Sequence, residues 1–130
     1  MVVLTTTFLD SFLYIKNINK IMIEILQQIG LSKNESKIYV TLSEIGLSSA
    51  YKIAKQSNIF KSNTYDTLKR LIEKGLVSHK TIEDKELYET TDPSYLLEIL
   101  NKKRELANQI IPQLRLIQQT DQSHTKFNSY

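Results

Sequence analysis

The sequence predicts a mainly α-helical fold with one two-stranded β-hairpin and a long final helix. Through the first 74 residues, apolar side chains recur at steps of three and four, which is the period of an amphipathic helix. After Gly75 the pattern changes to short runs of β-branched and aromatic residues, and after Pro93 the helical period returns. A chain of 130 residues is most economically one domain with a modest core.

Composition excludes several classes of protein. With 41% apolar and 24% charged residues, the chain resembles an ordinary soluble protein. It has no cysteine, so disulfides, thiolate metal sites and cysteine nucleophiles are excluded, and its three glycines leave little material for a phosphate-binding loop. We therefore expect no cofactor and no metal site. The formal charge of +3 permits an acidic partner.

The first 15 residues are apolar but lack a basic leader and are too short to cross a bilayer. We therefore expect a cytoplasmic protein without a membrane partner. Residues 8–15 have helical spacing with Thr7 and Asp10 as a cap pair, which predicts a short helix that packs on the domain or on a partner chain. The alternative, a helix on a membrane surface, has only Lys16 and Lys20 to meet anionic lipid. Residues 1–18 are treated as an extension of unknown role.

Two helices are expected at residues 19–29 and 32–45, and a third, shorter one follows Ser48 or Ser49 and ends before a turn at Ser57 and Asn58. Gly30 and Gly46 are stop signals, and Ser32 with Glu35 has the spacing of a capping box. The side chains expected to face inward are Ile21, Met22, Ile25, Leu26 and Ile29, then Ile38, Tyr39, Leu42 and Ile45, then Ala50, Ile53 and Ala54.

A fourth helix is expected at residues 62–74, with Ser62 as its N-cap and Gly75 as its stop. At 100° per residue, its sequence divides into an apolar side and a polar side, with Thr67 at the border. The apolar side carries Thr64, Tyr65, Leu68, Leu71 and Ile72, and the polar side carries Asn63, Asp66, Arg70 and Lys74.

A hairpin of residues 76–82 and 86–91 follows, with a tight acidic connection around Glu83 and Asp84. Asp92 followed by Pro93 predicts the N-cap and first residue of a last helix over 93–120. Pro112 should kink this helix, and residues 121–130 form a polar tail that we expect to fray. An apolar seam of the coiled-coil kind runs along it through Leu100, Lys103, Ala107, Ile110, Leu114 and Ile117.

Two short helices followed by a hairpin are typical of the winged helix-turn-helix. The order and spacing of LSKNESKIYVTLSEIG, YKIAKQSNI, KSNTYDTLKRLIEKGLV and LYETTDP also resemble the DNA-binding domain of TrmB-like archaeal transcriptional regulators, over a little more than half of the chain. The resemblance implies a winged-helix domain at 19–92. Phe60 departs from it, because proline is expected there. Larger members carry a C-terminal sugar-binding domain for which this chain has no room, so no small-molecule ligand is expected.

The fourth helix has the side chains that a major groove requires, with short polar groups near its start and cations behind them. Residues 50–80 hold seven cations and two carboxylates, a net +5 in a chain of +3. The Asp66 carboxylate should repel phosphates unless it accepts from a cytosine amine or orients Arg70. The acidic hairpin tip should avoid the minor groove. The candidate DNA contacts are Lys61, Ser62, Asn63, Asp66, Thr67, Lys69, Arg70, Lys74 and Lys80.

These patterns predict a transcriptional regulator that binds specific double-stranded DNA as a homodimer, paired through the seam of the last helix. The seam could instead pack back on its own domain. The basic helix could be a solvated surface, or the winged helix could bind proteins in a larger transcription or processing complex. Catalysis has little support, because His79 and His124 are the only histidines and no carboxylate pair is positioned to share a proton.

Overall fold

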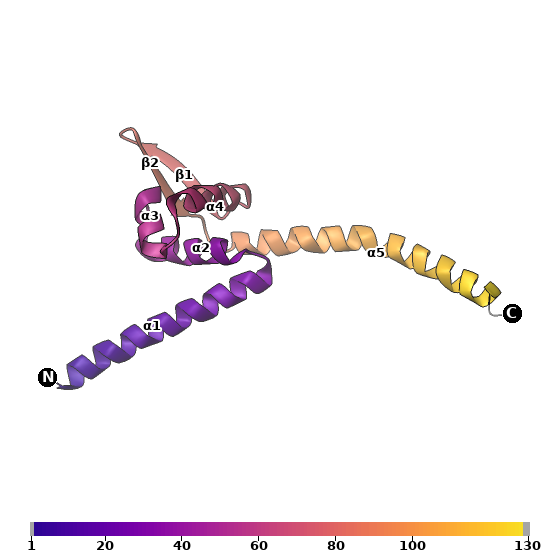
Figure 1. The fold of residues 1–130 in the computed structure, drawn as a ribbon, viewed down its shortest axis with the longest axis horizontal. Helices are drawn as coiled ribbons and strands as arrows, with labels where there is room; N and C mark the ends of the chain where they lie inside the picture. Colours follow the sequence, from indigo (N-terminus) through magenta and orange to yellow (C-terminus); the bar gives the residue numbers. More distant parts are fainter. Residues whose placement is uncertain (1, 129–130) are drawn as a thin grey trace. The chain divides into compact units, whose positions relative to one another are not determined.

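The computed structural model confirms a mainly helical fold with one hairpin (Figure 1). It describes the backbone of residues 2–128 and the side chains of residues 9–120. Two compact units divide the chain, residues 1–95 and residues 96–130. The elements are α1 (Val2–Ile29), α2 (Lys33–Ile45), α3 (Ala50–Ser57), α4 (Lys61–Glu73), β1 (Val77–Ile82), β2 (Lys85–Thr90) and α5 (Tyr95–Asn128).

The core of the first unit lies where α2, α3, α4 and the base of the hairpin meet (Figure 1). Its side chains are those that the helical spacing placed inward on α2 and α3, except for Ile45, which is only half-buried, together with Leu68 and Leu71 of α4 and Leu76 before β1. Each buried leucine or isoleucine stabilises the fold by roughly 1.5–3 kcal/mol. The completely buried large apolar side chains are Ile38, Leu42, Ile53, Leu68, Leu71 and Leu76.

Local capping fixes the ends of the short helices. The Ser32 hydroxyl accepts from the Glu35 backbone and the Glu35 carboxylate accepts from the Ser32 backbone, both at 3.1 Å, so the predicted capping box is present. Ser49 caps α3, and Asn58 ends it in the left-handed conformation. These caps hold α2 and α3 at fixed lengths around the turn that leads to α4.

The hairpin is tight and tied to the helices. Its strands pair antiparallel from Val77 opposite Thr90 to Ile82 opposite Lys85. Glu83 and Asp84 both have positive φ, 50° and 63°, as a two-residue turn that matches the strand twist requires. Backbone hydrogen bonds in both directions join Tyr88 to Ser48 at 2.8 and 3.0 Å, so the base of the hairpin is anchored to the loop between α2 and α3.

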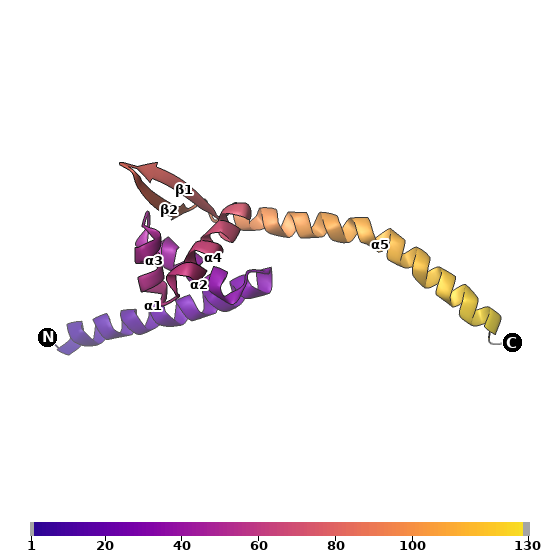
Figure 2. The same ribbon diagram turned by 45° about the horizontal axis from the view of Figure 1, so that its top comes forward.

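The N-terminal region differs from the two helices expected there. A single helix, α1, runs from Val2 to Ile29 without a break at residues 16–18, and Asp10 lies inside it (Figure 2). Nothing at the expected junction stops a helix, because the segment has neither glycine nor proline. The expected inward stripe is also wrong in part, since Ile21, Met22 and Ile25 are exposed. Leu26 is buried, and α1 packs against α2.

The last helix begins at Tyr95 and continues to Asn128, beyond the expected end at residue 120. Asp92 does act at its start, because its carboxylate accepts from the Ser94 backbone at 2.8 Å and its carbonyl accepts from Tyr95. The ribbon of α5 bends part-way along (Figure 2), as expected of a helix that contains Pro112. Every side chain from Leu100 to Thr120 is exposed in a single chain, while those of the polar tail lie outside the described residues.

Candidate nucleic-acid interface

The start of α4 is set by Phe60 rather than by Ser62, which corrects the predicted N-cap. The Phe60 carbonyl accepts from the Thr64 backbone at 2.9 Å and from the Thr64 hydroxyl at 3.1 Å, and Thr64 is completely buried. No side chain caps this helix. Lys61 and Ser62 therefore lie in its exposed first turn, with the unpaired N–H groups of the helix start beside them.

The buried side of α4 is rotated toward Thr67 relative to the expected side. Thr67 is completely buried, and its hydroxyl donates to the Asn63 carbonyl at 2.7 Å. Thr67 is therefore removed from the predicted base contacts, and the expectation failed because this internal hydrogen bond lets a threonine join the core. Conversely, Tyr65 and Ile72, expected inward, are 45% and 38% exposed.

Asp66 could orient Arg70 only through an ion pair between the two side chains, and that pair is not formed. A terminal nitrogen of the Arg70 guanidinium instead donates to the Thr67 hydroxyl at 3.3 Å. This hydrogen bond to Thr67 helps to hold the Arg70 guanidinium in place. The remaining donors of the guanidinium are available to a ligand. The predicted contacts that the structure brings to the exposed surface of α4 are Lys61, Ser62, Asn63, Asp66, Lys69 and Arg70.

Lys74 has a structural partner rather than an open surface. Its ammonium lies 2.5 Å from the carboxylate of Glu35, which is 4% exposed and belongs to the capping box of α2. Burial by itself would raise the pKa of Glu35. Hydrogen bonds from Lys74 and Ser32 outweigh burial, so the pKa of Glu35 lies below its ordinary value. Lys74 therefore ties the end of α4 to α2.

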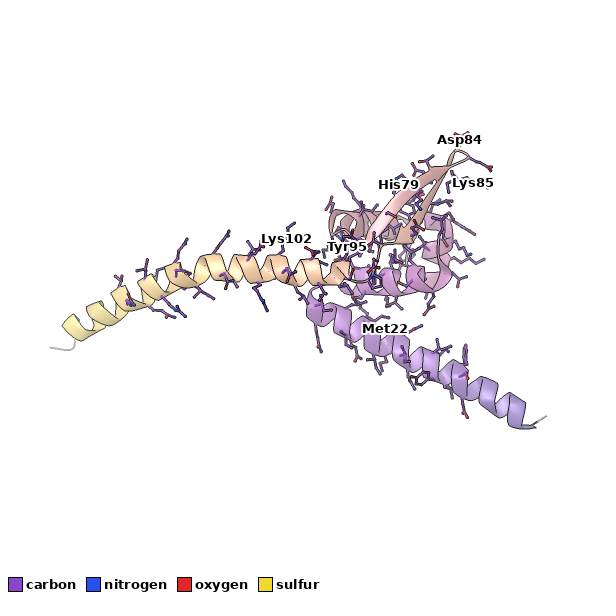
Figure 3. All side chains as sticks on the ribbon, turned by 180° about the vertical axis from the view of Figure 1, so that it is seen from behind. Met22, His79, Asp84, Lys85, Tyr95 and Lys102 are labelled. Atoms are coloured by element: carbon purple, nitrogen blue, oxygen red, sulfur yellow. The ribbon has the colours of Figure 1, made fainter. Side chains whose placement is uncertain are left out.

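Two basic side chains of the hairpin also lie near carboxylates. Lys80 forms an ion pair with Glu89 across the strands, and His79 lies 3.8 Å from the Glu86 carboxylate. The tip carries Asp84 beside Lys85 (Figure 3), and the loop and its flanking strand residues are exposed. The wing is therefore a poor phosphate ligand.

Five cations of the segment around α3 and α4 lack such compensation. They are exposed, and none takes part in an ion pair within residues 9–120, whose side chains the structure describes. Two of them lie on α3 and three on α4. These five are Lys52, Lys55, Lys61, Lys69 and Arg70, and with Ser62 and Asn63 they are called the basic face below.

The sequence patterns do not identify two exposed aromatic residues near this face. Tyr51 on α3 is 64% exposed and Phe60 is 81% exposed. The helical period could not identify them, because it separates apolar from polar positions but does not distinguish an exposed aromatic from a buried one. The one available signal was the absence of the expected proline at position 60.

Neither a cluster of metal ligands nor a membrane-spanning helix is found among the described residues. No three histidine, cysteine, aspartate or glutamate side chains gather as they would around a metal ion among the residues described. Within that same part of the chain, no helix has the length and apolar character to cross a membrane.

Comparison with known proteins supports the fold and the family. The chain is 40% identical over 75 residues to the HTH-type sugar sensing transcriptional regulator TrmBL1 of Pyrococcus furiosus. That match covers 56% of this chain and 21% of TrmBL1, so this chain spans only a fraction of that relative.

Solved structures share the winged-helix fold at lower identity. TrmBL2, described as an archaeal chromatin protein with a novel mode of DNA binding, superposes with a TM-score of 0.68 at 23% identity, over 78% of this chain and 39% of its own. A MarR family protein from Bacillus stearothermophilus superposes with a TM-score of 0.51 at 22% identity, over 93% of this chain and 96% of its own. Residues 26–94 match the family described as sugar-specific transcriptional regulator TrmB. The chain belongs to the TrmB family of transcriptional regulators.

Proposed function

We propose that this chain binds specific sequences of double-stranded DNA as a homodimer, with α4 in the major groove. The observation that carries the proposal is the basic face, because it joins five uncompensated cations to the exposed, uncapped start of one helix. B-DNA has a major groove about 12 Å wide, which admits one α-helix. Ser62 and Asn63 are the short polar groups for base edges, and the cations are the groups for phosphates.

The rigidity of α4 supports this role. Both of its ends are tied to the core, by Thr64 at the start and by the ion pair of Lys74 with Glu35 at the end. Its outer surface is open in a single chain, since Asn63 and Arg70 are both exposed. A helix fixed in this way presents its polar groups without further ordering, which lowers the entropic cost of binding.

The proposed dimer rests on the exposed apolar side chains of α5. Leu100, Ile110, Leu114 and Ile117 are 42–59% exposed in a single chain, and they repeat at coiled-coil spacing with Ala107. A two-fold dimer would double the DNA contacts and would place two copies of α4 on half-sites about 34 Å apart. The partner in this proposal is a second copy of the same chain.

The central test is duplex binding measured against salt. Each phosphate neutralised contributes about −0.9 to the slope of log K against log salt, so contacts from several cations in each of two subunits predict a steep slope. Selection of bound sequences from a random duplex pool should enrich a two-fold symmetric site. Duplex binding with a steep slope but no enriched sequence would contradict specificity, and a slope near zero would contradict DNA binding altogether.

Two variants that each remove one positive charge, from different helices, test where the DNA interface lies. Arg70→Ala should weaken duplex binding at least about fivefold and reduce the magnitude of the salt slope. Lys102→Ala removes one exposed cation from α5 (Figure 3) and should leave the affinity nearly unchanged. Equal effects of the two variants would mean that only total charge matters, and α4 would lose its assignment.

The runner-up is a winged helix that binds an acidic protein. The observation behind it is the hairpin tip, because a wing with Glu83 and Asp84 there is ill suited to a second contact with DNA and gives DNA binding no support. A shallow salt slope together with a stable complex with an acidic protein would support that alternative.

A further inference from the structure

Phe60 is the most exposed large apolar side chain among the described residues, at 81%. Its backbone is nevertheless firmly held. The Phe60 carbonyl accepts two hydrogen bonds from buried Thr64, and the Ile59 N–H donates to the Ala54 carbonyl at 3.1 Å. A fixed backbone limits the positions of the ring, so its exposure is a property of the turn rather than of a loose segment.

The ring borders an open hollow of about 270 Å³ between the end of α3 and the start of α4. Three of its lining side chains, Ala54, Ile59 and Phe60, are apolar, and the other two are Lys55 and Asn58. Lys61 follows Phe60 directly. The apolar lining thus has one cation, Lys55, at the hollow itself and a second, Lys61, next to Phe60 in the chain, and neither forms an ion pair within the described residues.

Duplex DNA presents this combination of chemistry. In the major groove, thymine carries a 5-methyl group at its edge, apolar side chains such as phenylalanine contact that methyl, and phosphates flank it on both sides. An apolar protein surface, by contrast, would have to desolvate Lys55 and Lys61 without compensation.

We propose that Phe60 packs against the 5-methyl group of one thymine in each half-site and so determines a preference for thymine there. This inference rests on the proposed function, because it requires α4 to lie in the major groove. The hollow beside the ring receives the methyl group, and Lys55 pairs with a neighbouring phosphate.

The test removes the methyl group alone. In a duplex selected by the native protein, each thymine is replaced in turn by deoxyuridine, which keeps every hydrogen bond of the base pair. We expect one position per half-site at which this change weakens binding about three- to fivefold, the effect of losing one buried methyl group. If cytosine at that position weakens binding, 5-methylcytosine should restore part of the loss.

Variants of Phe60 assign the effect to the ring. Phe60→Ala should bind thymine and deoxyuridine equally at that position, whereas Phe60→Leu should keep part of the difference, so the two changes are coupled. Ile82→Ala removes another exposed apolar side chain, near the hairpin tip, and should keep the native preference. Since Phe60 is exposed and alanine suits its backbone, thermal unfolding of Phe60→Ala should match the native chain.

The outcomes separate the two proposals. If the native protein selects no sequence and shows no salt slope, the proposed function fails. If it selects a site but no thymine methyl group matters, or if Phe60→Ala keeps the same methyl dependence, the inference on Phe60 fails alone. A lower sedimenting mass of Phe60→Ala would also overturn it, because the ring would then lie between copies of the chain.

Discussion

The region from α2 to β2 differs from the two long helices α1 and α5 in how its apolar surface is covered. In the first region, each apolar stripe meets another one within the same chain, and the helix ends carry capping hydrogen bonds or backbone turns. In the long helices, much of the apolar surface meets solvent. The first region, with Leu26 of α1 packed against it, buries its apolar core within one chain and is called the complete region below. The long helices have the composition of surfaces that require a partner.

The two long helices differ from each other in pattern. From Leu9 to Ile15, α1 exposes apolar side chains on nearly all sides, and a helix with that composition is normally buried all round. In α5 the apolar side chains follow a stripe, as in a coiled coil. In proteins, most of the stability of a helix comes from packing of its apolar face, so tertiary or subunit contacts must supply most of the stability of α5.

The largest expected effect is a loss of stability when a buried side chain is removed from the complete region. Ile38→Ala removes a completely buried side chain from α2 and should lower the free energy of unfolding by about 2–5 kcal/mol. Leu116→Ala in α5, where the side chain is 64% exposed and off the seam, should change it by less than about 0.5 kcal/mol. Urea denaturation of both variants measures the difference.

Similar losses in the free energy of unfolding for Ile38→Ala and Leu116→Ala would contradict the distinction between the buried region and the exposed helix α5. They would mean that α5 is buried on more than one side in the assembled protein.

The next effect concerns the seam of α5. Leu114→Glu places a charge in the proposed dimer contact and should weaken self-association about ten- to a hundredfold, or about 1.5–3 kcal/mol. Leu116→Glu introduces the same charge on another side of the helix and should leave association intact. Sedimentation over a range of concentrations compares the two.

A dimer that persists in Leu114→Glu would move the contact elsewhere. The exposed side chains of α1, such as Phe12 and Ile15, would then be the next candidates, and charge substitutions there would be the following experiment.

The complete region was largely predictable because its signals are local. The capping box of Ser32 and Glu35, the stop at Gly46 and the two-residue turn at Glu83 each depend on a few neighbouring residues. The helical period then placed Ile38, Leu42 and Ile53 correctly in the core.

The predictions of burial and pairing that failed concern residues whose local sequence allows two environments, so that tertiary packing decides between them. Thr67 lay at the border of two faces, and only the core contact with its hydrogen bond to Asn63 buries it. Lys74 looked like a phosphate ligand because its partner, Glu35, is 39 residues away. In α1 the apolar residues are too numerous to define one side, so the period could not tell that Ile21 and Ile25 are exposed.

The smallest effect concerns the ion pair that ties α4 to α2. Glu35→Gln keeps an acceptor for the Ser32 backbone but removes the charge that faces Lys74. The loss in the free energy of unfolding at neutral pH should be about 1 kcal/mol, since the Lys74 side chain is 34% exposed and remains hydrated. Glu73→Gln changes an exposed carboxylate of the same helix and serves as the control.

The pH dependence gives this prediction its sign. The folded pKa of Glu35 lies below its ordinary value of 4.5, so the unfolded chain binds this proton more readily. The contribution of the pair to stability is therefore fully present above about pH 5 and is lost as the pH falls through the folded pKa. Urea denaturation from pH 7 to pH 3 should show the difference between native and Glu35→Gln chains shrinking on acidification. A difference that stays constant would mean that the carboxylate acts through the shape of the cap rather than through its charge, and that α4 is held mainly by Thr64 and the core.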